Sequence, residues 1–276
     1  MTLTVPPVAI SCAGTAYLDL GGSGPALVLL HGVGLDHTMW AQQAAAFQGS
    51  WRVIAPDMLG HGDSPRPRAD AQLDDYADQI TALLSELGVT RAVLVGFSMG
   101  ALVARAIALA RPDWLIGLVL LNGVFDRGDD VRDAIAARVV EVEHGGPAAN
   151  AQAALQRWFT PAYHRDHAAE IAQLNDRLGR NDPQGYLATY RLFASEDNFG
   201  ADRLGTIAVP TLVATGEFDV GSTPEMAHAL AARIPDARTE ILPGARHMMP
   251  VEHAAQINDL LGRFLETPAI QRSSQP

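Results

Sequence analysis

One serine stands in a setting that could make it a nucleophile. Ser98 lies in the segment Gly96-Phe97-Ser98-Met99-Gly100, between an apolar run typical of a buried strand and a segment with the pattern of a helix. At such a tight turn, side chains two residues before and after the serine would collide with the neighbouring backbone. Glycine at both positions avoids this collision. The helix that begins there directs its partly positive N-terminus at the reacting atoms. The spacing therefore predicts a covalent catalyst, not an ordinary glycine turn.

A serine hydroxyl is a weak nucleophile unless a base takes its proton. His247, in the loop after the last predicted strand, is the candidate base. Asp219, which also follows a predicted strand, is the candidate carboxylate that orients the imidazole. Because all three residues follow strands, a parallel sheet would bring them to one edge. Asp126, after the strand predicted at 116–121, is the alternative acid.

A second glycine-containing segment could stabilise the negative oxygen of an acyl-transfer reaction. His31-Gly32-Val33-Gly34 follows a predicted strand, and its loop can turn the backbone N–H of Val33 toward a substrate. The N–H of Met99, after the candidate nucleophile, would be the second donor of such an oxyanion hole. A dinucleotide-binding motif is a weaker interpretation. The bulky His37 stands where that motif needs its third glycine.

The elements that must position these residues alternate along the chain. Apolar runs predict buried parallel strands at 26–30, 52–55, 92–95, 116–121, 211–214 and 239–242. Helical spacing predicts helices at 73–87, 99–110, 224–233 and 251–265, and residues 8–20 predict a hairpin. This alternation indicates an α/β fold, with a mostly parallel central sheet flanked by helices and an inserted helical cap. We expect a core at 1–124 and 201–267, the cap at 125–200 and a disordered tail at 268–276.

Composition excludes several classes of protein. The chain has 276 residues, of which 48% are hydrophobic, too many for an intrinsically disordered protein. Its net charge of −11 argues against nucleic acid and anionic membranes as partners. All 20 basic residues are arginines, so lysine-dependent Schiff-base enzymes and P-loop nucleotidases are excluded. The single cysteine, Cys12, excludes an intrachain disulfide and a cysteine-rich zinc site.

We expect a cytoplasmic protein without cofactor or metal. The first 20 residues lack the pattern of a signal peptide, and the apolar stretch at 115–125 is too short to cross a bilayer. His164, Asp166 and His167 have a spacing that metal ligands can have, but no further ligand set accompanies them. A solvated helix explains them better.

Taken together, the motifs resemble those of the serine hydrolase branch of the α/β-hydrolase superfamily. The segments HGVG at 31–34, DMLGHGDS at 57–64, GFSMG at 96–100, GEFD at 216–219 and GARH at 244–247 follow one another in the order of that family. The stretches HGVGLDHTMW at 31–40 and RWFTP at 157–161 are similar to 3-oxoadipate enol-lactonases and related hydrolases of ring-cleavage catabolism. Enol-lactonases often have Asn-Ser where this chain has His31-Gly32, so the resemblance does not identify the substrate.

The resemblance implies hydrolysis of a small carboxylic ester or enol-lactone through an acyl-enzyme, in the catabolism of aromatic or heterocyclic compounds. Hydrolysis of an activated amide or enamide, cleavage of a C–C bond next to a ketone, a perhydrolase and a non-catalytic ligand receptor remain open. The formation of a homo-oligomer also remains open. The resemblance places Trp158 of the cap at the substrate, and Tyr190 and Arg191 are further candidates for binding it. An arginine of the cap could hold a substrate carboxylate with its guanidinium fork.

Overall fold

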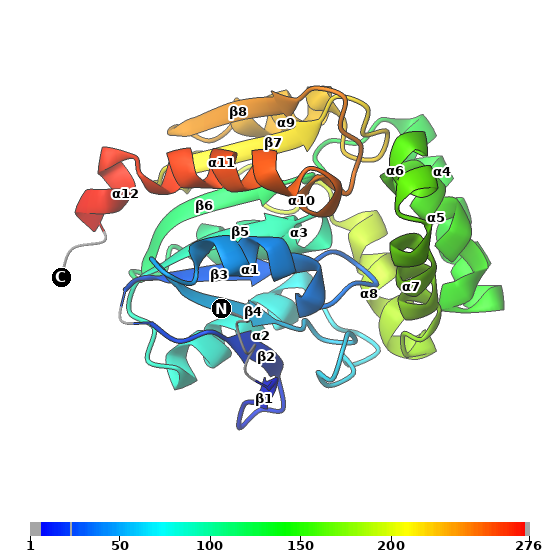
Figure 1. Ribbon diagram of the computed structural model, residues 1–276, viewed down its shortest axis with the longest axis horizontal. Helices are drawn as coiled ribbons and strands as arrows, with labels where there is room; N and C mark the ends of the chain where they lie inside the picture. Colours follow the sequence, from blue (N-terminus) through cyan, green and yellow to red (C-terminus); the bar gives the residue numbers. More distant parts are fainter. Residues whose placement is uncertain (1–6, 23, 274–276) are drawn as a thin grey trace.

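The computed structural model describes residues 7–22 and 24–273. Eight strands form one sheet in the order β1-β2-β4-β3-β5-β6-β7-β8 (Figure 1). The β1–β2 and β2–β4 pairs are antiparallel, and all other pairs are parallel. The strands are β1 (Ala9–Ile10), β2 (Ala16–Asp19), β3 (Ala26–Leu30), β4 (Arg52–Pro56), β5 (Ala92–Phe97), β6 (Leu115–Leu121), β7 (Thr211–Gly216) and β8 (Ala237–Leu242).

The central strands are buried on both faces, which explains their continuous apolar sequences. Every residue of β3, β5 and β6 is buried. The parallel register pairs Leu30 of β3 with Gly96 of β5, and Phe97 of β5 with Leu121 of β6. These strands therefore end together, and the loops that follow them lie side by side at one edge of the sheet. The predicted α/β fold with a mostly parallel sheet is confirmed.

Helices cover both faces of the sheet, and the sheet divides the apolar core into two layers (Figure 1). Along β3, Val28 and Leu30 belong to one layer, and Leu27 and Leu29 belong to the other. The first layer includes residues of α2 (Leu73–Glu86), α3 (Met99–Leu109) and α9 (Pro224–Ala231). The second includes residues of α1 (Ala41–Phe47), α11 (Ala254–Leu265) and α12 (Pro268–Ser273). The short α10 (Met249–Glu252) precedes α11.

Between β6 and β7 the chain forms a block of helices, which we name the cap segment (residues 125–200). Figure 1 shows this block beside the edge at which the parallel strands end. All of its residues are described, and none of them is in a strand. Its α-helices are α4 (Asp129–Gly145), α5 (Ala151–Trp158), α6 (Pro161–Asp166), α7 (Ala168–Gly179) and α8 (Pro183–Ser195). The cap segment therefore lies over the loops at that edge and over the side chains that they carry.

The C-terminal part of the chain corrects one sequence prediction. Residues 268–273 of the expected disordered tail form α12, whereas 274–276 lie outside the described residues. Ile270 is fully buried, and its Cδ1 lies only 2.4 Å from where a Cβ on Gly117 of β6 would be. The glycine leaves a space in the sheet surface that this side chain fills. The order of the helix therefore comes from a distant contact that the polar local sequence does not reveal.

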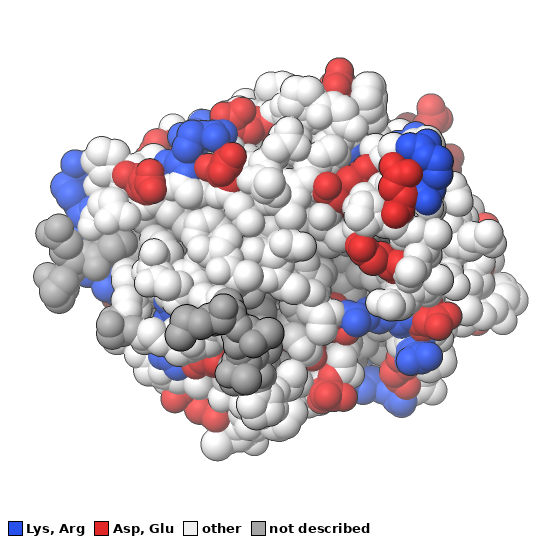
Figure 2. All heavy atoms as spheres, in the orientation of Figure 1, with Lys and Arg blue, Asp and Glu red and all other residues white. Residues whose placement is uncertain are grey.

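Among the described residues, no helix is long and apolar enough to cross a membrane. On the face that Figure 2 shows, the arginines of the described part of the chain stand among acidic side chains and do not gather into a stripe. A basic stripe is what a nucleic-acid-binding surface requires.

Candidate active site

The turn around Ser98 is as tight as the glycines predict. β5 ends at Phe97 and α3 begins at Met99, so Ser98 alone connects strand to helix. Its φ of +54° and ψ of −112° are unfavourable for a residue with a side chain. A Cβ on Gly96 would lie 2.2 Å from the carbonyl oxygen of Gly100. No side chain could be tolerated there, because the Cβ would meet main chain, which cannot move aside.

Asp219 and His247 are brought together by the loops that follow β7 and β8. The Nδ1 atom of His247 lies 2.6 Å from Oδ2 of Asp219, a hydrogen bond between two buried side chains. The other carboxylate oxygen accepts hydrogen bonds from the backbone N–H groups of Gly221 and Ser222, at 2.9 and 3.0 Å. Nδ2 of Asn122 donates to Oδ2 at 2.7 Å. The carboxylate is therefore held from three directions.

The surroundings of Asp219 determine the charge of its carboxyl group. Burial by itself raises the pKa of Asp219, but the charge and hydrogen bond of His247, together with the Asn122 amide, outweigh it and lower the pKa below its usual value. An ionised carboxylate can only accept, so the His247 Nδ1–H donates and Nε2 is left to act as a base. Asp126, the alternative acid, is exposed at the surface. Asn122, directly after β6 at the same sheet edge, is a residue that sequence reasoning missed.

A cavity of about 400 Å³ contains the predicted nucleophile and its partners. Ser98, Asp219 and His247 all line it, and Ser98 is only 3% exposed. The imidazole of His247 lies between two aromatic rings, with centroid distances of 5.0 Å to Phe97 and 5.8 Å to Trp158. Three residues that are far apart in the sequence thus meet at one cavity.

The loop after β3 carries the first predicted oxyanion donor. Val33 is buried and lines the same cavity. A Cβ on Gly32 would lie 3.0 Å from the Phe97 ring and 3.3 Å from Cβ of Ser98, so the loop runs directly against the nucleophile. Met99 follows Ser98 as the first residue of α3, where a backbone N–H has no acceptor within the helix.

Two buried histidines, both of them neutral, form hydrogen bonds that hold this loop. Nε2 of His31 accepts from the N–H of Met58 at 2.9 Å, and Nε2 of His61 accepts from the N–H of Gly34 at 2.8 Å. A protonated ring has no acceptor, so both rings must be neutral. Burial lowers the pKa of His61 to about 3. Burial likewise lowers the pKa of His31.

The cap segment provides the opposite wall of the cavity. Two of the residues that we expect to bind substrate, Trp158 and Tyr190, line it. Arg191 does not, and this part of the expectation is wrong: its side chain is exposed, with Nη2 2.7 Å from Oε1 of Glu143. Tyr190 and Phe193, three residues apart on α8, face the cavity, and Arg191 is turned about 100° away from Tyr190 around the helix.

Other arginines take the place expected for Arg191. Arg127, Arg138 and Arg157 all line the cavity. Arg157 is half-buried, and burial together with the charge of Arg138 lowers its pKa. Arg127 is buried, with Nη1 donating to the carbonyl of Phe193 at 2.8 Å, and burial lowers its pKa to about 10. Three acidic side chains, those of Asp130, Glu141 and Asp219, line the same cavity, so both signs of charge are present in its wall.

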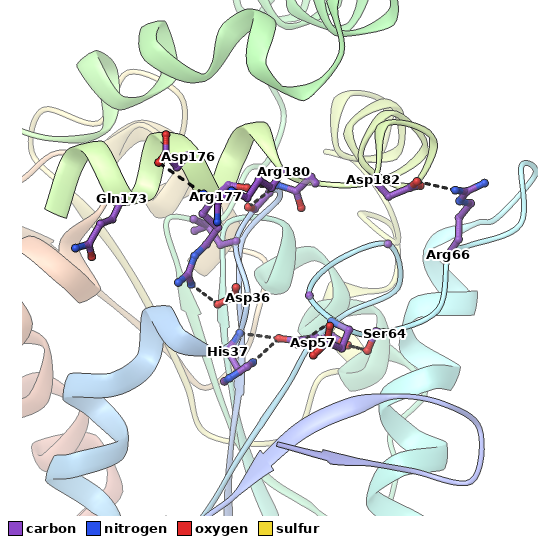
Figure 3. Close-up of a pocket in the computed structure, with 16 residues that line it drawn as sticks. Asp36, His37, Asp57, Ser64, Arg66, Gln173, Asp176, Arg177, Arg180 and Asp182 are labelled. Atoms are coloured by element: carbon purple, nitrogen blue, oxygen red, sulfur yellow. Dashed lines mark hydrogen bonds and ion pairs between the residues drawn. The ribbon is translucent and has the colours of Figure 1, made fainter. Parts of the chain in front are cut away.

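A second, larger cavity of about 540 Å³ lies between the loops after β3 and β4 and the helices α7 and α8 (Figure 3). Its charged side chains pair with one another. Arg66 lies 2.6 Å from Asp182, and Nδ1 of His37 lies 2.8 Å from Oδ1 of Asp57. Burial by itself lowers the pKa of His37, but its hydrogen bond to Asp57 outweighs this and raises it. The pair of Arg66 and Asp182 ties the cap segment to the core.

The same cavity contains a group of side chains that could ligate a metal. Ligand atoms of Asp36, His37 and Asp57 lie within 4.8 Å of one another. The Oδ1 atom of Asp57 already accepts from the N–H and ring of His37, and Oδ1 of Asp36 already accepts from Arg177. The group is therefore accounted for as a network of ion pairs.

Comparison with known proteins agrees with this architecture. A family model described as alpha/beta hydrolase fold matches residues 25–254. The (E)-2-((N-methylformamido)methylene)succinate hydrolase of Acinetobacter baylyi is 34% identical over 253 residues, which cover 92% of this chain and 95% of that protein. The 3-oxoadipate enol-lactonase 2 of the same organism is 30% identical over 257 residues, which cover 93% of each.

A solved structure gives the same result. The crystal structure of the enol-lactonase from Burkholderia xenovorans LB400 superposes with a TM-score of 0.87 at 29% identity, and the match covers 95% of this chain and 100% of that one. Similarity therefore extends over the sheet, its helices and the cap segment. The chain belongs to the alpha/beta hydrolase fold family of hydrolases, as its motifs predict.

Proposed function

We propose that this protein is a serine hydrolase that cleaves a small carboxylic ester or enol-lactone through an acyl-enzyme. The observation that carries the proposal is the 2.6 Å hydrogen bond between Asp219 and His247 at the cavity that Ser98 lines. An ionised acid, an imidazole with a free Nε2 and a serine at a strained turn have the roles of a catalytic triad. In this proposal the three residues act without a cofactor.

The reaction begins when Oγ of Ser98 attacks the acyl carbon and its proton passes to Nε2 of His247. The carbonyl oxygen becomes negative and accepts hydrogen bonds from the N–H groups of Val33 and Met99. His247 then gives the proton to the leaving oxygen, which for a lactone stays attached to the acyl group. Water, deprotonated by His247, attacks the acyl-enzyme and releases the acid, which restores Ser98. Asp219 remains ionised and stabilises the imidazolium in both steps.

Two arginines of the cavity support a substrate that carries a carboxylate. Arg138 and Arg157 line the cavity beside Trp158 and Tyr190, which offer an apolar surface. The guanidinium of an arginine binds a carboxylate through two parallel hydrogen bonds. The names of the two Acinetobacter relatives describe a succinate and an oxoadipate, and both of these carry carboxylates. We propose a small carboxylated ester or lactone, such as arises in the breakdown of aromatic rings or heterocycles.

A second candidate is hydrolysis of an activated amide. Its support is the 34% identical relative, whose name describes a formamido group on a succinate. The same serine attack applies, except that the leaving atom is an enamide nitrogen. The two candidates therefore differ in substrate and share one site.

A hydrolysis assay tests both. The panel contains a carboxylated enol-lactone, a carboxylated N-formyl enamide and the neutral ester 4-nitrophenyl acetate, each with the wild type and with Ser98→Ala. We expect the enol-lactone to be the best substrate and Ser98→Ala to lose about 10⁴-fold or more. A higher kcat/KM for the enamide would select the second candidate. Turnover that survives in Ser98→Ala would refute the covalent mechanism.

A further inference from the structure

The loop that carries the proposed oxyanion donor is held from two sides. On the core side, the N–H of Gly34 donates to Nε2 of His61 at 2.8 Å. On the cap side, Nδ2 of Asn181 donates to the carbonyl oxygen of the same glycine at 2.9 Å. Val33, whose N–H is the proposed donor, immediately precedes Gly34. Two different parts of the molecule thus fix the N–H and the C=O of one residue.

Packing at Gly34 strengthens the contact with the cap segment. Its φ is +77°, and a Cβ there would lie 2.7 Å from Leu178 and 2.8 Å from Tyr186. The side chains of α7 and α8 therefore press directly on the loop backbone. Close by, Nη1 of Arg177 lies 2.5 Å from Oδ1 of Asp36. Figure 3 shows these two side chains pointing toward one another. The cap segment and this loop form one continuous contact.

We propose that Asn181 is a positioning residue that completes the oxyanion hole from the cap. By holding the carbonyl of Gly34, it aligns the N–H of Val33 with the oxygen that becomes negative when Ser98 attacks. The inference rests on the proposed function, because it requires Val33 to be an oxyanion donor. A donor must lie about 2.7–3.1 Å from that oxygen. A displacement of about 1 Å can cost up to about 100-fold in rate.

The proposal gives the cap segment a part in the chemical step in addition to substrate binding. The contact of Asn181 depends on the position of the C-terminal end of α7, which is in the cap segment. When the cap segment is in the position seen here, the loop is held on both sides. If it moved away, the loop would keep only its core contacts, such as that with His61. Closure over a substrate would therefore also align the oxyanion donor.

The test compares Asn181→Ala with a matched variant at another contact between cap and core. Arg66 of the core bonds to Asp182 and Gln184 of the cap segment, at 2.6 and 2.5 Å, and not to the oxyanion loop, so Arg66→Ala is the control. Figure 3 shows its contact with Asp182. For each variant we would measure kcat and KM for 4-nitrophenyl acetate and the urea midpoint of unfolding. The rate at which a fluorophosphonate labels Ser98 is a further readout, because its phosphoryl oxygen occupies the oxyanion hole.

We expect Asn181→Ala to lower kcat and the labelling rate about tenfold each, with KM within about twofold of the wild type. The isosteric Asn181→Asp, which has no N–H for the carbonyl of Gly34, should lose at least as much. Arg66→Ala should keep its kcat within about twofold.

Two results would overturn the inference. One is a wild-type kcat and labelling rate in Asn181→Ala, and the other is an equal loss in both alanine variants, which would indicate a general effect of cap contacts. If the wild type itself is not labelled, the proposed function fails, and this result is distinct from either of the other two.

Discussion

Asp219 is a buried carboxylate whose charge depends on its neighbours. His247 and Asn122 outweigh the effect of burial and lower its pKa, so it is ionised near neutral pH. The ionised form is the one that accepts Nδ1–H and leaves Nε2 free. Chain order alone indicates that an acid precedes His247; in the structure Asp219 bonds to His247 and Asp126 is exposed, which supports the proposal that Asp219 is the acid.

Asp219→Asn should therefore lower kcat by about 10⁴-fold with little change in stability, since an amide can hold the wrong imidazole tautomer. The measurement is kcat for 4-nitrophenyl acetate, with Asp126→Asn as the matched variant, whose rate should stay within about twofold. If Asp126→Asn were the variant that lost its activity, the assignment of the acid would be wrong.

Among the cavity arginines, Arg157 offers a test of substrate class. Arg157→Ala should lower kcat/KM for a carboxylated ester by about 10- to 100-fold, because a charge-assisted hydrogen bond contributes about 1.5–3 kcal/mol. The loss for 4-nitrophenyl acetate should be much smaller. Arg191→Ala, on the outer side of α8, is the control and should change neither value. An equal loss on both esters in Arg157→Ala would argue against carboxylate recognition.

At the scale of elements, the turn between β5 and α3 depends on backbone contacts. A Cβ on Gly100 would lie 2.3 Å from the carbonyl oxygen of Leu30 and 2.6 Å from that of His31. Because main chain cannot move aside as a side chain can, Gly100→Ala should lower the free energy of unfolding by about 3 kcal/mol or more.

Gly262, in α11, is the matched control for this substitution. A Cβ there meets nothing within 4 Å, so Gly262→Ala should leave stability unchanged or raise it by up to about 1 kcal/mol. Urea denaturation of the two variants measures the difference. Equal midpoints would show that the tight turn is not what requires glycine at position 100.

The elements differ in how well the sequence predicts them, and burial explains why. The bounds predicted for β3 match the structure, because all five of its residues are apolar and covered on both faces. β8 is at the edge, where its residues are only partly buried, and its first two, Ala237 and Arg238, were not predicted. α1 was not predicted either, because at seven residues a helix depends on packing more than on its own sequence.

The residues of the candidate site also differ in how well the sequence predicts them. Ser98, Asp219 and His247 are predictable, because each follows a strand with an apolar signature and carries the chemistry in its own side chain. Asn122 and Asn181 are not, because they act through hydrogen bonds to residues far away in the sequence. The face of α8 that carries Arg191 is likewise set by how the cap segment packs.

At the scale of the whole molecule, the buried histidines make stability depend on pH. The pKa of His61 is lowered from 6.5 to about 3 in the folded state, so between these values the unfolded chain binds a proton that the folded protein does not. Stability is therefore lost as the pH falls below 6.5. For His61 alone the loss between pH 7 and pH 5 is about 2 kcal/mol.

Urea denaturation at pH 7 and pH 5 measures this effect as a difference between variants. In His61→Gln, the drop in the free energy of unfolding between the two pH values should be about 2 kcal/mol smaller than in the wild type. His144→Gln, at an exposed position of α4, should keep the wild-type drop. If His61→Gln also keeps it, His61 is not the neutral, buried acceptor that we describe.

The most direct measurement is peptide mapping by mass spectrometry after treatment with a fluorophosphonate. This reagent reacts with a serine that a base has activated, so it needs the hydroxyl, the imidazole and the carboxylate to act together. We predict a single adduct on Ser98 in the wild type and none at that position in His247→Ala. An unmodified wild-type protein, or an adduct on another residue, would contradict the account.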